Sequence, residues 1–206
     1  EGTLWIGTAG GLYSRDRATD SLVYHPHPGH PKIEPRFMNM TAMAEIEPGR
    51  YWVATEIGPY LFSRDTGGFE PLASWLDRYR PDEWRKELQN TFAIHIDDGG
   101  RVWFSSDRRG IDIYDPAGDS YVNISADPDG RFGLADANVA ALFVDRDGVY
   151  WIGTAAGLSR LDPRTLRFKT WVEDPDGDAG PSTNDINRVF EDGSGALWVG
   201  TDNGAE

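Results

Sequence analysis

A repeated tryptophan-centred segment is the feature that most constrains how this chain can fold. Five segments share an aliphatic or aromatic residue, a tryptophan, an apolar residue and two small residues, and their tryptophans are spaced by 47, 51, 48 and 47 residues. These anchors are Trp5, Trp52, Trp103, Trp151 and Trp198. A period of this length is typical of propeller blades, in which each repeat forms one four-stranded sheet.

The fourth repeat shows the expected strands most clearly. Apolar or alternating segments at 138–144, 149–154, 158–162 and 166–172 are separated by short stretches that contain Asp, Pro or Gly. These residues favour turns because Asp caps its own backbone, Pro fixes φ and Gly tolerates positive φ. The repeat therefore predicts a meander of four antiparallel strands, which we call A to D.

The spacing within the anchor segment suggests a packing role for the tryptophan. Side chains alternate between the two faces of a strand, so Trp151 and Gly153 should share one face. A large ring beside a missing side chain leaves a step into which a neighbouring blade can fit. A buried tryptophan removes about 150–250 Å² from water, so we interpret the five anchors as contacts between blades.

These patterns predict an all-β chain: a β-propeller of about four four-stranded blades, forming one domain over 1–206. A helical insertion is expected at about 75–89, within the longest connection. The chain opens and closes on a B strand, at 3–8 and 196–201. Two B strands would compete for one place in a closed ring, so we expect a partial ring cut from a longer propeller. Its uncovered ends could pair two copies as a homodimer.

Composition excludes several functional classes. The formal net charge is −14 and the sequence has no cysteine. A chain this acidic lacks the basic surface that nucleic acids require. The lack of cysteine excludes disulfides, thiolate catalysis and cysteine-ligated metals.

The last two repeats resemble a known family. Residues 138–158 and 184–201 are similar to the two-component regulator propeller repeat. The second and third repeats depart from it, because Ala54 and Ser105 replace the glycine and Ser106 replaces the threonine. The resemblance implies a periplasmic sensing region of a bacterial receptor, ahead of a histidine kinase or a cyclic-dinucleotide output module.

Candidate ligand-binding residues lie where the repeats differ, because shared positions serve packing. The B–C loops and the D–A connections should lie on one face of the propeller. The candidates there are Glu56, Trp75, Tyr79, Trp84, Arg108 and Arg109. Exposed aromatic rings could stack on sugars, and arginine could hold an acid. Alternatively, a short helix at 81–88 caps the disc with its aromatics inward, and the two arginines are simply solvated.

Two kinds of loop raise the question of metal binding. Three of the four histidines lie in 25–30, and acidic connections lie at 127–130 and 174–178. Prolines around the histidines turn their side chains apart, and the acidic loops lack the ordered ligand series of a hand-type calcium loop. We therefore predict no metal and no cofactor, and we assign no catalytic residue.

The leading hypothesis is a non-enzymatic sensor domain that binds a small molecule, with a carbohydrate as the candidate, and signals to an output domain outside this sequence. A second hypothesis is a propeller lyase or hydrolase acting on a polysaccharide or cyclic peptide, with His95 or a histidine of 25–30 as its base. A third is a protein-interaction scaffold.

Overall fold

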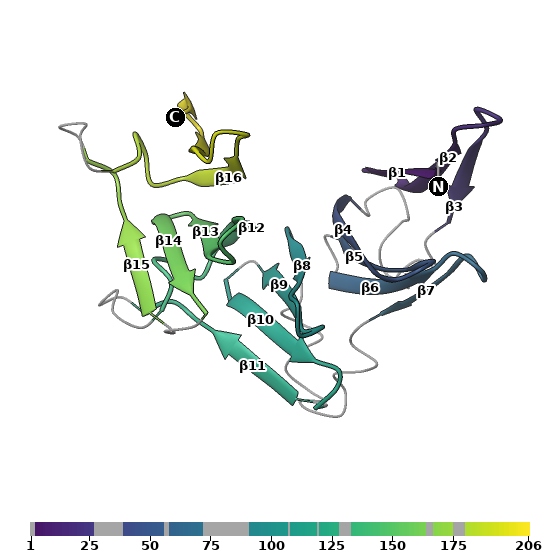
Figure 1. Ribbon diagram of the computed structural model, residues 1–206, viewed down its shortest axis with the longest axis horizontal. Coiled ribbons are helices and arrows are strands. Elements are labelled where there is room, and N and C mark those ends of the chain that lie inside the picture. The colour runs from purple at the N-terminus through teal and green to yellow at the C-terminus, as the bar shows by residue number, and fades with distance from the viewer. Residues whose placement is uncertain are drawn as a thin grey trace. The chain divides into compact units, whose positions relative to one another are not determined.

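The computed structural model describes residues 3–26, 39–55, 58–71, 91–106, 108–118, 120–127, 133–163, 167–174 and 180–206. The chain forms two compact units, Glu1–Ile94 and His95–Glu206, which we treat separately. The strands of the described residues pair in antiparallel sheets that are joined by turns and loops (Figure 1). Within those residues, no helix is both long and apolar enough to cross a membrane.

The described residues form five sheets that follow one another in sequence, and we number them as blades 1 to 5. Blade 1 comprises β1 (Thr3–Thr8), β2 (Gly11–Asp16) and β3 (Leu22–His25). Blade 2 comprises β4 (Met40–Glu47), β5 (Arg50–Thr55), β6 (Gly58–Ser63) and β7 (Gly68–Pro71). Blade 3 comprises β8 (Ile94–Ile96), β9 (Val102–Ser106), β10 (Gly110–Asp115) and β11 (Ser120–Ile124). Blade 4 comprises β12 (Val139–Val144), β13 (Tyr150–Thr154), β14 (Gly157–Asp162) and β15 (Arg167–Trp171). Blade 5 comprises β16 (Ile186–Glu191), β17 (Leu197–Thr201) and β18 (Gly204–Ala205).

The predicted count of about four blades is wrong, because the described residues form five sheets. Blades 2, 3 and 4 have four strands each, whereas blades 1 and 5 have three. The prediction counted four-stranded repeats as blades. A repeat with fewer strands nevertheless pairs its own strands into a sheet. The all-β prediction is confirmed, and the four strands of blade 4 lie within two residues of their predicted bounds.

The A–B turn of blade 4 explains why those bounds were predictable. Gly148 has a φ of 77°, and its amide donates to the carbonyl of Asp145 at 3.0 Å. The Asp145 carboxylate accepts from the amides of Asp147 and Val149, each at 2.9 Å. The turn therefore needs aspartate at its start and glycine at its left-handed position.

In the first unit, the core lies between blades 1 and 2. Trp5 packs against Tyr51 and Phe62 of blade 2, with ring centroids 5.3 and 5.4 Å apart. Met40, the first residue of β4, joins the same cluster. It lies beside Gly7, where an added Cβ would come within 3.2 Å of the Met40 Cβ.

In the second unit, the same arrangement recurs between blades 3 and 4. Trp103 is almost fully buried and stacks on Tyr150 of blade 4, with centroids 4.2 Å apart and an interplanar angle of 25°. Ile152 and Leu161 complete this cluster from blade 4. Each of these blades thus presents its tryptophan face to the blade that follows it.

The glycine two residues after the anchor tryptophan accommodates the next blade. A Cβ added at Gly153 would lie 2.7 Å from Ile186 Cγ2 and 2.9 Å from the Ile186 carbonyl oxygen. Ile186 begins β16 of blade 5. This contact confirms the prediction that a neighbouring blade fits into the step left by the missing side chain.

In blade 5, the face that carries the anchor tryptophan is exposed to solvent. Phe190 and Trp198 are paired across β16 and β17, and they are 58% and 47% exposed. At Gly200 the three atoms nearest to an added Cβ all belong to Arg188 of the same sheet, the closest at 3.3 Å. Within the described residues, no further sheet packs on this face.

Candidate functional site

The B–C turns of blades 1, 4 and 5 share a threonine that holds the turn closed. The hydroxyls of Thr8, Thr154 and Thr201 donate to the carbonyl of the glycine three residues later, at 2.9, 2.8 and 3.2 Å. Each hydroxyl also accepts from the amide two residues later. The conserved geometry of these turns is structural. This role was not predicted, although each of these threonines is followed three residues later by a glycine in the sequence.

Blade 3 differs, because three residues rather than two separate its strands B and C. β9 ends at Ser106 and β10 begins at Gly110. Gly110 has a φ of 82°, and an added Cβ would overlap the carbonyl oxygen of Ile124. Its amide donates to the carbonyl of Ala137 at 2.7 Å. Glycine is therefore required where the longer loop rejoins the sheet.

A buried polar cluster holds this loop. Asp112 on β10 is fully buried, and its carboxylate accepts from Asn123 Nδ2 at 2.5 Å. Arg109 Nε lies 3.9 Å from Asp112 Oδ2, and the Asn123 amide also donates to the Arg109 carbonyl at 3.1 Å. Burying a carboxylate is costly unless it is paired. The cluster therefore fixes Arg109 and the loop backbone against the sheet.

The two loop arginines thus lie in different environments. The Arg109 side chain is 16% exposed and faces Asp112, whereas Arg108 is exposed. Arg108 has a φ of 69°, a left-handed conformation that non-glycine residues seldom adopt. The geometry gives Arg109 a positioning role and leaves Arg108 as the arginine presented to solvent. Periodicity could not separate these roles, because the distinction depends on the position of Asp112.

The other candidate residues lie outside the described part of the chain. These are Glu56, Trp75, Tyr79 and Trp84, together with the helix expected at about 75–89. The structure brings none of them into a described site with Arg108.

The two described histidines pack against aromatic rings. His25 lies 5.2 Å from both Trp5 and Phe62, and its Nε2 is 2.8 Å from Ser14 Oγ. Burial lowers its pKa. His95 makes an edge contact with Tyr150 at 5.6 Å, and burial lowers its pKa despite the opposing charges of Asp97 and Asp98. Both rings are therefore biased towards the neutral form.

The aspartates of the A–B turns form a repeated hydrogen-bonded clasp with the anchor tryptophans. Trp103, Trp151 and Trp198 donate from Nε1 to an aspartate six residues earlier, at 2.9, 2.8 and 2.8 Å. The acceptors are Oδ2 atoms of Asp97, Asp145 and Asp192, whose Oδ1 atoms bind turn amides. Each of these carboxylates therefore also stabilises its own A–B turn. The indole bond was not anticipated, although the six-residue spacing occurs three times.

Two of these clasps lower the pKa of the carboxyl group. Partial burial raises the pKa of Asp97, but hydrogen bonds from Trp103 and Arg101 outweigh it and lower the pKa overall. Hydrogen bonds from Ser194 and Trp198 hold the pKa of Asp192 well below its usual range. Both groups stay ionised at neutral pH, where they can accept the indole N–H.

Comparison with known proteins supports the family resemblance. Residues 133–156 and 180–203 match the two component regulator propeller family. The resemblance inferred from the sequence is thereby confirmed for these two repeats. A search of curated proteins gives no match.

Solved structures share the fold over nearly the whole chain. The extracellular domain of a putative hybrid two component system from B. thetaiotaomicron has a TM-score of 0.73 at 20% identity, covering 98% of this chain and 25% of that one. A second such domain from the same organism has a TM-score of 0.68 at 18% identity, with coverages of 98% and 24%. Virginiamycin B lyase from Staphylococcus aureus has a TM-score of 0.63 at 13% identity, with coverages of 100% and 65%. The chain therefore has the β-propeller fold, and it spans about a quarter of the two extracellular domains.

Proposed function

We propose that this chain is part of the extracytoplasmic sensing propeller of a bacterial signalling receptor and has no catalytic activity of its own. The observation that carries this proposal is the pair of two component regulator propeller repeats, 133–156 and 180–203, within a fold shared with extracellular receptor domains. A fold alone does not define a function, so the proposal rests on repeat and fold together. The output domain, a kinase or a cyclase, would lie outside this sequence.

The ligand that we propose is a small molecule bound on the face formed by the B–C loops and D–A connections, with a carbohydrate as the first class to test. The loop of blade 3 supports this location, because it is longer than the other B–C turns and presents Arg108. An arginine favours a carboxylate or sulfate on the sugar. Glu56, Trp75, Tyr79 and Trp84 remain proposed ligand-binding residues of the first unit.

We also propose that the chain is one segment of a longer propeller. The tryptophan face of blade 5 is uncovered, whereas Trp103 in blade 3 is only 3% exposed beneath blade 4. The step at Gly153 receives Ile186, but the step at Gly200 receives no residue of a following blade. Another blade would bury both Phe190 and Trp198.

Isothermal titration calorimetry with neutral and uronic acid oligosaccharides tests the ligand proposal. We expect the acidic sugars to bind and Arg108→Ala to weaken them by about tenfold, the loss typical of one charged hydrogen bond. Arg17→Ala is the matched control, because Arg17 is exposed in the C–D turn of blade 1. If Arg108→Ala and Arg17→Ala bind the acidic sugars with equal affinity, the proposal that Arg108 binds the ligand is rejected. If no sugar gives a heat of binding, the proposal that the ligand is a carbohydrate is rejected.

A lyase is the second candidate, because a lyase propeller shares the fold. His95 is the described residue that suits a base, since burial lowers its pKa. Turnover of a polysaccharide or cyclic peptide that is lost in His95→Ala would establish the enzyme. Absence of turnover with every substrate tested would favour the sensor.

A further inference from the structure

A pocket of about 530 Å³ lies between the A–B turns of blades 3 and 4, within the second unit. In an antiparallel meander, the A–B and C–D turns lie at one end of the strands and the B–C turns at the other. The pocket is therefore separate from the B–C loop that presents Arg108. Its volume is in the range of small-molecule sites. Asp97 and Asp98 line it from blade 3, and Asp145 and Asp147 line it from blade 4.

Two of these four carboxylates are already held by the clasps described above, those of Asp97 and Asp145. Asp97 also pairs with Arg101 at 2.6 Å, which offsets its charge. The side chains of Asp98 and Asp147 are exposed, and within the described residues no hydrogen bond or ion pair engages either carboxylate. The pocket therefore has two carboxylates that are free to bind a ligand.

A buried hydroxyl group also lines the pocket. Tyr150 is 4% exposed, and its hydroxyl has no hydrogen-bond partner among the described residues. Burial, followed by the charge of nearby Asp97, raises the pKa of this hydroxyl to about 12, so it stays protonated at neutral pH. His95 lies beside it, with ring centroids 5.6 Å apart, and in the described part of the chain its ring nitrogens have no partner either. Buried polar groups are normally hydrogen-bonded, so these two side chains are available to a polar ligand.

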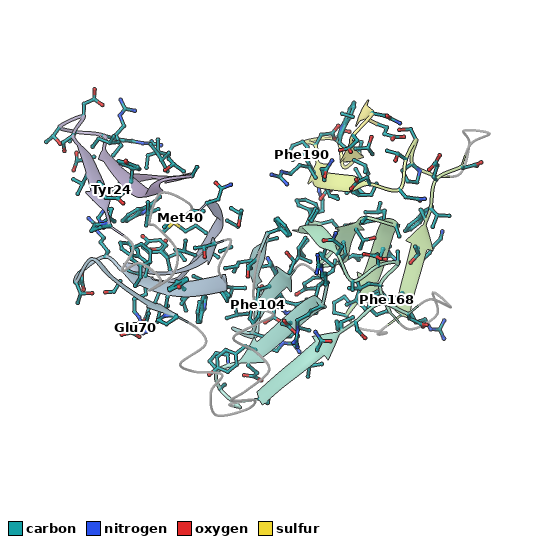
Figure 2. The ribbon with its side chains drawn as sticks, turned by 180° about the vertical axis from the view of Figure 1, so that it is seen from behind. Tyr24, Met40, Glu70, Phe104, Phe168 and Phe190 are labelled. Atoms are coloured by element: carbon teal, nitrogen blue, oxygen red, sulfur yellow. The ribbon has the colours of Figure 1, made fainter. Side chains whose placement is uncertain are left out.

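Between blades 4 and 5, the fold supplies its own cation at the equivalent place. Arg146 follows the clasp aspartate of blade 4, and its guanidinium pairs with Glu191 and donates to the Asp192 carbonyl at 2.7 Å. The Arg146 amide also donates to the Glu191 carboxylate at 3.1 Å. Glu191 ends β16 next to Phe190, which is labelled on that strand in Figure 2. This cation therefore joins the A–B turns of two consecutive blades.

Blades 3 and 4 lack this cation because the sequence differs at both positions. Asp98 occupies in blade 3 the position that Arg146 occupies in blade 4, directly after the clasp aspartate. Val144 occupies in blade 4 the position that Glu191 occupies in blade 5, directly before that aspartate. The charge is thus reversed at the place where a guanidinium lies one blade later. A cationic ligand would make the contact that the side chains here do not make.

We infer that this pocket binds a small organic cation with two charged ends, each an ammonium or guanidinium group. One end would lie beside Asp98, as the Arg146 guanidinium lies one blade later, and the other would bind Asp147. Such groups carry several N–H donors and no acceptor, which suits carboxylates, a tyrosine oxygen and a neutral imidazole. A metal ion is a poorer match, because no three His, Asp or Glu side chains of the described residues are grouped to hold one. This inference is independent of the sugar proposed for the loop face.

The probes are agmatine, which carries a guanidinium and an ammonium group, and 4-guanidinobutanoate, in which a carboxylate replaces the ammonium group. Isothermal titration calorimetry with the 206-residue chain measures both. Salt at about 0.15 M screens the non-specific attraction of cations to a chain of net charge −14. We expect agmatine to bind at least about tenfold more tightly, because its second cation meets a carboxylate where 4-guanidinobutanoate brings a like charge.

Asp98→Asn and Asp147→Asn are the pocket variants, and Asp185→Asn is their matched control. Asp185 is also an exposed aspartate of the second unit, but it does not line the pocket. We expect each pocket variant to weaken agmatine binding by about tenfold, and Asp185→Asn to change it by less than about twofold. Because all three variants lose the same charge, a difference between them reports the position of the charge rather than the net charge.

Tyr150→Phe separates a ligand contact from a structural role. It deletes the hydroxyl and keeps the ring that stacks on Trp103 at 4.2 Å. We expect the urea midpoint of the free protein to stay unchanged or rise, and agmatine affinity to fall by about threefold to tenfold. A hydroxyl with a purely structural role would give the opposite result, a lower midpoint with unchanged affinity.

Four results would overturn the inference. They are no heat of binding from agmatine, equal binding of the two probes, equal agmatine affinity in Asp98→Asn and Asp185→Asn, and unchanged agmatine affinity in Tyr150→Phe. Calcium that binds more tightly than agmatine, and whose binding is lost in Asp98→Asn, would also overturn it and would identify the pocket as a metal site.

Discussion

At the scale of single residues, the aspartate clasp links the turn to the core. In blade 4, one carboxylate oxygen of Asp145 binds two turn amides while the other accepts the indole N–H of Trp151. The tryptophan is thus oriented by a polar bond as well as by packing. Removing the acceptor would leave the amides and the indole without partners, which costs more than a typical hydrogen bond is worth.

We therefore expect Asp145→Ala to lower the free energy of unfolding by about 2–3 kcal/mol. Asp145→Asn should recover part of that loss, because one amide oxygen can still accept. Asp147→Ala is the control, since Asp147 is exposed in the same turn, and its effect should stay within about 0.5 kcal/mol. Urea unfolding followed by tryptophan fluorescence measures all three, and equal effects of Asp145→Ala and Asp147→Ala would contradict the clasp.

The lowered pKa of Asp97 predicts acid sensitivity. A carboxyl group whose pKa is lower in the folded state stabilises the fold above its unfolded pKa of about 3.9, and this stabilisation is lost as the pH falls through the folded value. Wild type should therefore exceed Asp97→Asn in stability at pH 6, and this difference should shrink below about pH 4. Urea midpoints at pH 6, 4 and 3 measure it. A difference that does not change with pH would show that the charge of Asp97 is irrelevant.

At the scale of elements, the glycine step decides how closely two blades approach. Gly153 and Gly200 hold equivalent positions after Trp151 and Trp198, but only Gly153 faces a following blade. The two glycines therefore form an internal comparison. The nearest atom to the added methyl group belongs to Ile186 of the next blade at one site and to Arg188 of the same sheet at the other.

Gly153→Ala should lower the free energy of unfolding by about 1–3 kcal/mol, as expected for overpacking. Gly200→Ala should cost much less, because its nearest contact is the Arg188 Cβ at 3.3 Å. Combining Gly153→Ala with Ile186→Ala should cost less than the sum of the two single changes, since the smaller side chain makes room. Urea unfolding of the four variants tests this, and additive effects would mean that the step does not hold Ile186.

The sequence predicted the elements well where turn chemistry repeats. Blade 4 was placed correctly because Asp145, Gly148 and Gly157 mark its turns. The packing of Gly153 followed from strand alternation. The burial of Arg109 could not be predicted, because it depends on Asp112 and Asn123 meeting across two strands whose register the sequence does not specify. The pocket between the A–B turns of blades 3 and 4 depends on how the two blades pack, which no single repeat encodes.

At the scale of the whole molecule, each unit is a short array in which one blade packs on the next: blade 1 on blade 2 in the first unit, and blades 3, 4 and 5 in order in the second. In such an array, an uncovered end face lowers the stability of the end blade and offers a surface on which another chain can pack. The number of blades was the feature predicted least well. A repeat that lacks a strand was not counted as a blade from the sequence, but it forms its own sheet in the structure. The rings of Phe190 and Trp198 in blade 5 are exposed because, within the described residues, no sheet packs on their face.

The uncovered face of blade 5 should make the isolated chain self-associate. Phe190 and Trp198 lie side by side across β16 and β17 and are about half exposed. Burying two such rings against a second copy is favourable by several kcal/mol at about 25 cal/mol per Å². Sedimentation velocity at rising concentration should show a dimer, and Phe190→Glu should return the chain to a monomer. Ile46→Glu is the control, because Ile46 is 42% exposed on β4, in the other unit. A wild-type chain that stays monomeric at all concentrations, with cooperative unfolding, would show that this face is stable in water and that no further blade is needed to cover it.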